Sequence, residues 1–428
     1  MRLFKVILYS LIFSTSALGA SADYDKVANF LCSTPLNNKT FVYADDFAPG
    51  FIKAVPESYF TSIIKSLTDT TGKCASISQV LVLPSGARYN FVSSTGDYST
   101  LDFHIDDKGM IDTFLLHGVS LPSVVIKNWA DINSYSKNLH GDISVTIKSD
   151  TGRSDRRLGD ALHPLGSAFK LYVLGTAIDK ISNGTLKWTD TFPITKDWKS
   201  LPSGQMQDWP DGKAVTVQQY AESMIKISDN TATDHLIHIL GRGDVEKQLS
   251  IMGNDFISKN EPLLMTSEMF RLKWAAPTDI INQFLNGNET VRRDLLNQKI
   301  DPTPLSQVGK NGISMENPSF ITDIEWFGST NSLCTAMSTL KNKNSPEAMS
   351  ILAKSVPLLD LGASSQWEYG GFKGGSEPGV LTMTFLLKSK SQYWGCVSVA
   401  WHDTAKPLNE YVMFDFVQKV LKVAEDYF

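Results

Sequence analysis

The sequence lacks several features that assign proteins to common classes. After the N-terminal segment no apolar run approaches the length of about 20 residues that a membrane helix needs, so no membrane span is expected. The 40 lysine and arginine residues are well mixed with 45 aspartate and glutamate residues, and the net charge is −5, which gives no basic surface for nucleic acid. There is also no internal repeat or low-complexity tract, which argues against a repeat architecture.

Cysteines are scarce, with only Cys32, Cys74, Cys334 and Cys396 in 428 residues. None lies in a spacing typical of a zinc site or a catalytic thiol. In an exported protein, Cys32 could pair with Cys74 and Cys334 with Cys396, each pair within one domain. Four buried free thiols are the alternative, because a chain of this size does not need disulfides to fold.

Metal ligands are equally sparse. His235 and His238 lie three positions apart on a predicted helix, a spacing that zinc accepts, but no third ligand accompanies them. We therefore expect no metal and no other cofactor.

The N-terminus has the composition of a targeting segment. Arg2 and Lys5 precede an apolar run over 6–13, and small residues follow up to Ala22. This order is typical of a cleavable secretory signal. A lipid anchor is not indicated, because no cysteine lies near the cleavage point. We predict that residues 1–22 are a signal peptide and that the mature protein is exported, to the periplasm or the medium.

Two domains with an α+β fold are predicted after this signal. Residues 23–73 have a helical pattern, and β-rich segments separated by turns follow up to about residue 118, which predicts helices and then an antiparallel meander over 23–125. In 126–428, strand-like segments at 142–148, 379–388 and 393–402 enclose a helical region. Strands at both ends of a domain predict a single antiparallel sheet built from its two termini.

The stretch "HPLGSAFK" contains the first candidate for chemistry, Ser167 with Lys170. Residues three positions apart share a helix face, and a neutral amine there can take the proton of the serine hydroxyl. Taken alone, the pair could equally be ordinary helix surface. His163 could line such a site or shape the turn at Pro164.

Two later segments provide further candidates. Ser228-Asp229-Asn230 follows a helical stretch, although Asp229 could simply cap the next helix. Lys373-Gly374-Gly375-Ser376 leads into a strand, where glycines let a substrate backbone approach and the lysine can bind a carboxylate. A turn with a solvated lysine is the alternative there.

Taken together, the order Ser-x-x-Lys, Ser-Asp-Asn and Lys-Gly-Gly before a late strand resembles the motif set of class A β-lactamases and penicillin-binding proteins. The resemblance covers roughly residues 127–428. It implies that Ser167 is the nucleophile, Lys170 its base and Ser228 a proton relay to the leaving nitrogen.

The same resemblance implies the substrate-binding residues. Asn230 would hold the substrate amide and Lys170, Lys373 would meet a substrate carboxylate, Gly375 would shape the strand edge and Ser376 would add a hydroxyl contact. The backbone N–H groups of Ser167 and Ser376 would form the oxyanion hole.

Three departures from the family pattern stand out. Gly374 replaces the usual threonine, and the long interval between Ser228 and Lys373 predicts an insertion around 276–320. In the family a glutamate of a Glu-Pro-x-Leu-Asn loop activates the hydrolytic water. Here Glu261 precedes a proline, but Met265 stands where the asparagine belongs, so Glu261 is a candidate deacylation base with a surface glutamate as the alternative.

The two-domain layout is similar to that of serine hydrolases of the clavulanic-acid-pathway type, whose N-terminal domain is steroid-isomerase-like. We therefore expect an exported serine hydrolase acting through an acyl-enzyme on a β-lactam or a related amide or ester. The alternatives are a penicillin-binding-protein-like peptidase acting on cell-wall peptides, or a sensor that is acylated without turnover. In each case the partner is a small molecule or a peptide.

Overall fold

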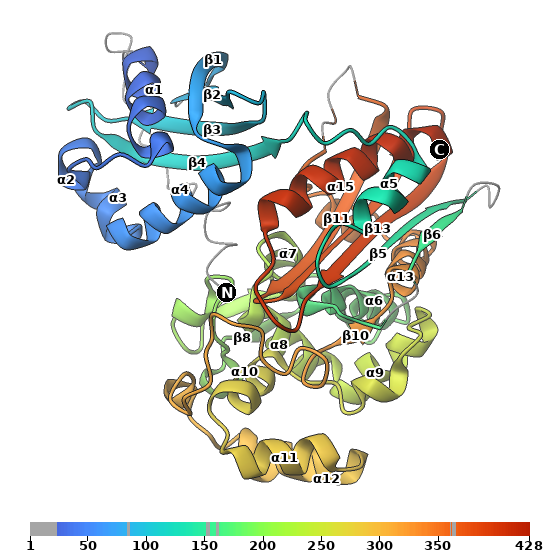
Figure 1. Cartoon of the computed structure of the whole chain (residues 1–428). Coiled ribbons are helices and arrows are strands. Elements are labelled where there is room, and N and C mark those ends of the chain that lie inside the picture. Colours follow the sequence, from blue (N-terminus) through green and yellow to red (C-terminus); the bar gives the residue numbers. More distant parts are fainter. Residues whose placement is uncertain (1–23, 84–85, 151–154, 160–161, 360, 362–364) are drawn as a thin grey trace. The chain divides into compact units, whose positions relative to one another are not determined.

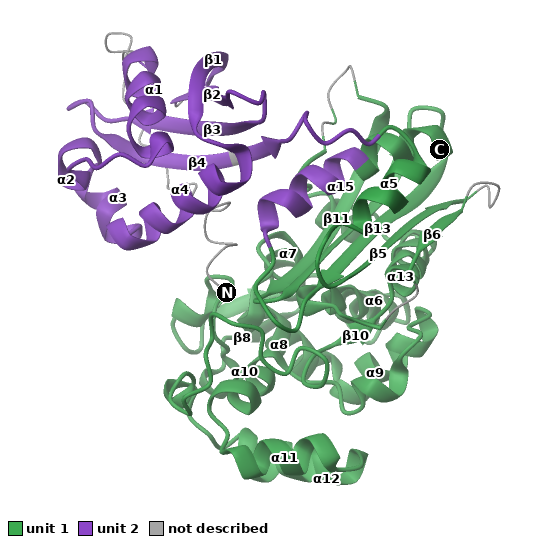
Figure 2. Ribbon diagram, in the orientation of Figure 1, with its two compact units in different colours: residues 1, 127–408, 420–428 green, residues 2–126, 409–419 purple. Residues whose placement is uncertain are grey.

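The computed structural model describes the chain from residue 24 to residue 428, apart from 84–85, 151–154, 160–161, 360 and 362–364. The predicted signal peptide, residues 1–22, lies outside the described residues. Within these ranges the chain divides into two compact units (Figure 2), one formed by residues 24–126 with Asn409–Lys419 and the other by Lys127–Leu408 with Val420–Phe428. Within the described ranges no helix is long and apolar enough to cross a membrane.

The N-terminal unit consists of helices followed by a four-stranded antiparallel meander, the order that the sequence predicts (Figure 1). Its helices are α1 (Tyr24–Ser33), α2 (Tyr43–Asp46), α3 (Pro49–Ala54) and α4 (Glu57–Thr71), with a short 3₁₀ turn at Pro35–Asn37. Its strands, paired in sequence order, are β1 (Cys74–Leu83), β2 (Gly86–Ser93), β3 (Tyr98–Ile105) and β4 (Ile111–Ser120).

Side-chain alternation explains this sheet. Along β3 every second residue is buried, as expected for a strand with one face on a core and the other toward solvent. The core contains many aromatic rings, including Phe47, Phe60 and Phe103. A disulfide between Cys32 of α1 and Cys74 of β1, with Cα atoms 5.3 Å apart, links the helices to the sheet.

The C-terminal unit contains a five-stranded antiparallel sheet in the order β11-β12-β13-β5-β6. Strands β5 (Asp142–Ser149) and β6 (Arg156–Leu158) come from the beginning of the unit, and β11 (Trp367–Glu377), β12 (Val380–Ser389) and β13 (Trp394–His402) come from its end. The prediction of an α+β fold with one sheet built from both termini is therefore confirmed.

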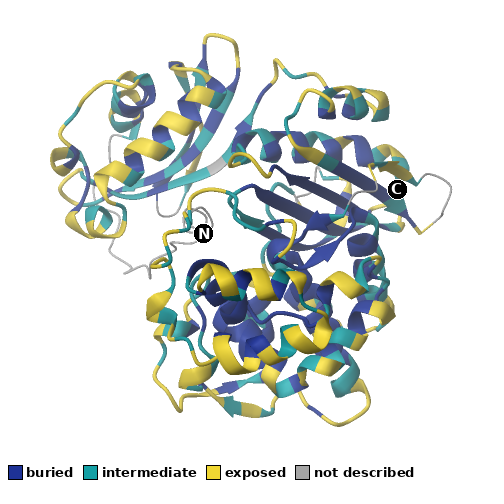
Figure 3. Cartoon of the chain, turned by 60° about the horizontal axis from the view of Figure 1, so that its bottom comes forward, coloured by how far each residue is buried: buried dark blue, intermediate teal, exposed yellow. Residues whose placement is uncertain are grey.

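The central strands of this sheet are almost entirely buried, which explains their continuous apolar sequence (Figure 3). Helix α13 (Thr330–Asn342) packs on β12, β13 and β5. A second disulfide joins Cys334 of α13 to Cys396 of β13, with Cα atoms 5.4 Å apart. The alternative of four free thiols is thus excluded, since all four cysteines are disulfide-bonded.

The remaining elements are mostly helices. Helix α5 (Trp129–Ser136) precedes β5, and α15 (Glu410–Ala424) follows β13 and begins in the segment that clusters with the N-terminal unit. The further helices between the two groups of strands are α6 (Lys170–Ser182), α7 (Val217–Lys226), α8 (Asn230–Leu240), α9 (Arg242–Ile251), α10 (Thr266–Trp274), α11 (Thr278–Asn286), α12 (Glu289–Leu295) and α14 (Pro346–Leu352). Two-stranded pairs are formed by β7 (His163–Pro164) with β10 (Phe327–Gly328) and by β8 (Thr191–Pro193) with β9 (Ala214–Thr216). Short 3₁₀ or π turns lie at Gly166–Phe169, Lys196–Trp198, Met206–Asp208, Ile257–Asn260, Leu296–Ile300, Leu305–Gln307 and Glu425–Tyr427.

The segment predicted to carry an insertion contains α11 and α12. These helices form the lower end of the C-terminal unit in Figure 1.

Candidate active site

Ser167 lies in a 3₁₀ turn (Gly166–Phe169) that runs directly into α6. The turn packs tightly against β11. A Cβ atom on Gly375 would lie 2.4 Å from the backbone nitrogen of Ser167, and a Cβ on Gly166 would lie 2.9 Å from the backbone nitrogen of Ser376. Only glycine allows this close approach, which brings the backbone N–H groups of Ser167 and Ser376 to neighbouring positions.

Two buried lysines meet at one serine hydroxyl. The Nζ atom of Lys170 lies 3.2 Å from Ser228 Oγ, and the Nζ atom of Lys373 lies 3.0 Å from the same oxygen. Lys170 also donates to Asn230 Oδ1 and to the Ser228 carbonyl, each at 2.7 Å. The structure thus brings together residues of α6, the segment before α8 and β11 that are far apart in the sequence.

Burial decides the protonation of these amines. Burial lowers the pKa of Lys170 to about 7, although the negative charges of Asp229 and Asp234 act to raise it. Burial, and then the positive charge of Lys170, lower the pKa of Lys373 well below its ordinary value. At neutral pH Lys170 is therefore neutral in a large fraction of molecules, as a proton acceptor must be.

Ser228 is held by the residues around it. Its backbone φ of 56° lies in the left-handed region, which residues other than glycine seldom adopt. Asp229 caps α8 by accepting from the N–H of Ala232 at 2.9 Å, and its other oxygen accepts from the N–H groups of Gln205 and Met206 at 2.7 and 3.0 Å. The capping alternative for Asp229 is therefore correct, and the same carboxylate also fixes the neighbouring loop.

That loop contributes a residue that no motif indicates. Ser203 donates from Oγ to the Ser228 carbonyl at 2.7 Å and lines the pocket in front of Ser167. The surrounding segment, "KSLPSGQ", matches no catalytic motif, so the sequence alone does not indicate Ser203.

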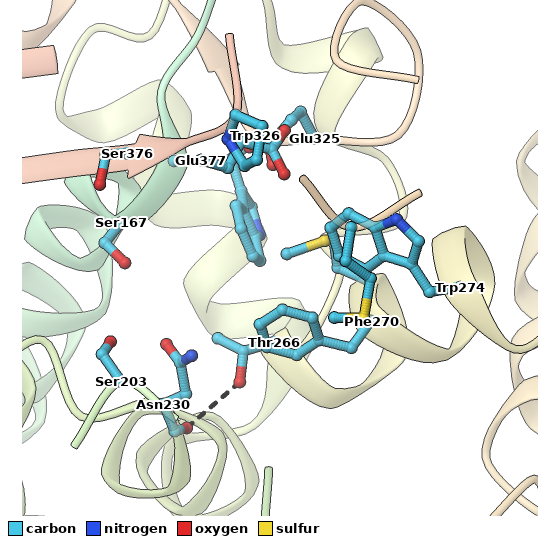
Figure 4. A pocket seen from close by; sticks show the side chains of 14 residues that line it. Ser167, Ser203, Asn230, Thr266, Phe270, Trp274, Glu325, Trp326, Ser376 and Glu377 are labelled. Atoms are coloured by element: carbon cyan, nitrogen blue, oxygen red, sulfur yellow. Dashed lines mark hydrogen bonds between the residues drawn. The ribbon is translucent and has the colours of Figure 1, made fainter. Parts of the chain in front are cut away.

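The pocket is an open depression that encloses about 520 Å³ of space not occupied by protein atoms, part of which belongs to the bulk solvent. In Figure 4, Ser167 and Ser376 lie on one side of it and Trp274 on the opposite side. Its polar lining consists of Ser167, Ser203, Asn230, Thr266, Glu325, Ser376 and Glu377, and its apolar lining includes Met269, Phe270, Trp274, Met315 and Trp326.

Glu261, the candidate deacylation base, is half-buried at the end of a 3₁₀ turn and is not among the residues that line this pocket. Instead, its segment presents Thr266, whose hydroxyl contacts Ser200 Oγ and Asp234 Oδ1, each at 2.8 Å. The carboxyl groups in the pocket wall are Glu325 and Glu377, which the motifs did not identify, although Glu377 directly follows Ser376.

Two further sequence features find a structural explanation. A Cβ atom on Gly374 would lie 2.8 Å from Phe372 Cζ and 3.0 Å from the Thr382 carbonyl oxygen, so a larger residue at this position would require its neighbours to move. His163 is fully buried and contacts Ser144 Oγ at 2.7 Å and His402 at 2.9 Å. It therefore supports the segment before Ser167 and does not line the pocket.

Comparisons with known proteins agree with these motifs. A family model described as "Beta-lactamase enzyme family" matches residues 126–294. This match confirms the resemblance to β-lactamase-like serine hydrolases over residues 126–294, the part that contains Ser167, Lys170 and Ser228. The steroid-isomerase-like character of residues 23–125 stays a prediction.

Three solved structures are similar to the chain at low sequence identity. A β-lactamase from Sphaerobacter thermophilus DSM 20745 is 18% identical, with a TM-score of 0.48 over 70% of this chain and 96% of that one. PBP-A is 15% identical, with a TM-score of 0.48 over 70% and 94%. A β-lactamase from Chitinophaga pinensis DSM 2588 is 15% identical, with a TM-score of 0.47 over 70% and 98%. No curated protein sequence matches the chain.

Proposed function

We propose that residues 126–428 are an exported serine hydrolase that forms an acyl-enzyme on Ser167 with a β-lactam or a related amide or ester. The observation that carries this proposal is the buried chain of groups from Lys170 through Ser228 to Lys373, next to the pocket that Ser167 lines. Such a pair of buried amines around a hydroxyl has no value for stability, because burying them costs free energy.

In the proposed reaction the Ser167 oxygen attacks the carbonyl carbon of the substrate, and Lys170 takes the hydroxyl proton. The negative charge that develops on the carbonyl oxygen is stabilised by the N–H groups of Ser167 and Ser376. Ser228 then passes its proton to the leaving nitrogen as the carbon–nitrogen bond breaks, and Lys170, which now holds the proton from Ser167, reprotonates Ser228. The products of this half-reaction are an ester on Ser167 and the freed amine.

In the same scheme Asn230, Lys373, Gly375 and Ser376 bind the substrate. Asn230 is already anchored, because its Nδ2 donates to the Leu201 carbonyl at 3.0 Å while its Oδ1 accepts from Lys170. Lys373 also donates to the Gly374 carbonyl at 2.6 Å, and its protonated form has one further N–H that would bind a substrate carboxylate.

A second candidate function follows from the position of Glu261. A hydrolytic water needs a base, and the residue proposed from the motif does not reach the pocket wall. This favours slow release of the acyl group, as in a penicillin-binding-protein-like peptidase whose acceptor is not water, or a sensor that keeps the adduct.

The decisive experiment is intact-mass measurement after incubation with a fluorescent penicillin, a chromogenic cephalosporin and p-nitrophenyl esters. An adduct on Ser167 or turnover supports the proposal, and either signal should disappear in Ser167→Ala. The control is Ser250→Ala, a change of an exposed serine on α9, which should leave the signal intact. If no acyl donor of any class reacts with the wild type, Ser167 is not a nucleophile.

The rate of release separates the two candidate functions. Turnover that is lost in Glu261→Gln would identify that residue as the base. A stable adduct in the wild type, or release unchanged by this substitution, would mean that Glu261 is not the deacylation base.

A further inference from the structure

Three buried charged side chains form a cluster at one wall of the pocket. Lys273, on α10, donates to Glu377 Oε1 at 2.6 Å and to Glu325 Oε1 at 3.2 Å. Their side chains are 0%, 7% and 1% exposed, respectively. The pocket is lined by both glutamates but not by the lysine, so the acidic groups are the ones that face a ligand.

This cluster has one hydrogen-bond donor too few. The second oxygen of Glu325 accepts from the backbone N–H of Trp326 at 3.1 Å, whereas the second oxygen of Glu377 is buried and has no donor among the described residues. Burial and the neighbouring charge of Glu325 raise the pKa of Glu377 to about 8, although Lys273 acts to lower it. At pH 7 a carboxyl group with this pKa is mostly protonated, so in the free protein Glu377 itself carries a proton where the donor is missing.

The surroundings favour one kind of replacement for that proton. Two carboxyl groups face one lysine, so the ionised cluster carries one unbalanced negative charge. Trp274, Trp326 and Phe270 line the same pocket, and the faces of aromatic rings attract organic cations. The edge of Trp326 is fixed, because its Nε1 donates to the Leu264 carbonyl at 2.8 Å and its ring stacks on Phe169 at 3.9 Å.

We propose that Glu377 and Glu325, with these aromatic rings, form a subsite for a cationic nitrogen on the acyl donor. The subsite selects substrates that carry an ammonium group near an apolar group, and the ammonium replaces the proton of Glu377. This inference rests on the proposed acylation of Ser167 and names the substrate class of that same site.

The test compares two penicillins that differ by one ammonium group. Benzylpenicillin and its α-amino derivative, ampicillin, are reacted at pH 7 and the rates of adduct formation on Ser167 are measured. The wild type should react faster with ampicillin, and Glu377→Gln should lower the ampicillin-to-benzylpenicillin rate ratio by about tenfold, the effect of losing one hydrogen bond to a charged group. A ratio within twofold of the wild type would overturn the subsite.

Glu368→Gln is the matched control, because Glu368 lies on the same strand but is exposed and paired with Lys388 at 3.0 Å. This variant should keep the wild-type ratio. Since loss of one member of the cluster could impair folding, Glu325→Gln is measured in parallel, and acylation by benzylpenicillin shows that either variant is folded.

A binding measurement keeps this inference separate from the proposed function. Benzylammonium should quench or shift the tryptophan fluorescence of the wild type at concentrations at least fivefold lower than benzyl alcohol, the neutral analogue. Equal effects of the two compounds would refute the subsite. Failure of benzylpenicillin to label Ser167 would instead refute the acylation proposal, while the benzylammonium result would still decide whether the cation binds.

Discussion

The pH dependence of acylation tests the role of Lys170 directly. The decrease of its pKa from 10.5 to about 7 corresponds to about 5 kcal/mol in favour of the neutral amine. Only the neutral amine can accept the Ser167 proton, so the acylation rate should follow its population. That population rises from about one tenth at pH 6 to about nine tenths at pH 8, which predicts a tenfold increase followed by a plateau.

The assay is a stopped-flow measurement of adduct formation with a fluorescent penicillin between pH 5.5 and 9, under single-turnover conditions. Lys170→Arg is expected to lose acylation at every pH, because a guanidinium stays protonated in this range. Lys180→Arg, a change on the same helix at a lysine paired with Asp244, should keep the wild-type profile. A flat profile, or a rate that falls as the pH rises through 7, would refute Lys170 as the base.

Two further predictions concern the frame of the site. In Gly375→Ala the new Cβ would lie 2.2 Å from the Leu165 carbonyl oxygen, so the strand must shift away from the turn that contains Ser167. Acylation should become about 100-fold slower, which is the effect of displacing one oxyanion donor. A stopped-flow rate within fivefold of the wild type would contradict this prediction. Replacing both Cys334 and Cys396 by serine should lower the free energy of unfolding by about 4 kcal/mol, since the disulfide spans 62 positions. Urea unfolding measures this loss, and a decrease below about 1 kcal/mol would mean that the disulfide does not restrain the unfolded chain.

The sequence predicts the parts of the site that depend on local motifs. Ser167 and Lys170 lie three positions apart in a turn that runs into α6, so their neighbourhood follows from helix geometry, and Ser228 and Asn230 are close because only one residue separates them. The meeting of Lys373 with Ser228 could be inferred only from the family resemblance, because no local rule joins positions so far apart. The order of helices, meander and sheet was predictable because hydrophobic periodicity changes visibly between these segments.

The acidic wall of the pocket could not be predicted in this way. Lys273 meets Glu325 and Glu377 across sequence separations of 52 and 104 residues, and each residue alone resembles an ordinary surface charge. The position of Thr266 in the pocket could not be predicted either. Thr266 begins α10, and the position of that helix depends on its packing against other elements. The choice between disulfides and free thiols also required the three-dimensional distances.

The sheet built from both ends of the C-terminal unit has a consequence for biosynthesis. Strand β5 leaves the ribosome early but pairs with β13, one of the last strands to be made. The turn with Ser167 and Lys170 is therefore made long before β11, which carries Lys373 and Ser376. If the proposed acylation is correct, the chain becomes reactive only after its last strands have closed the sheet.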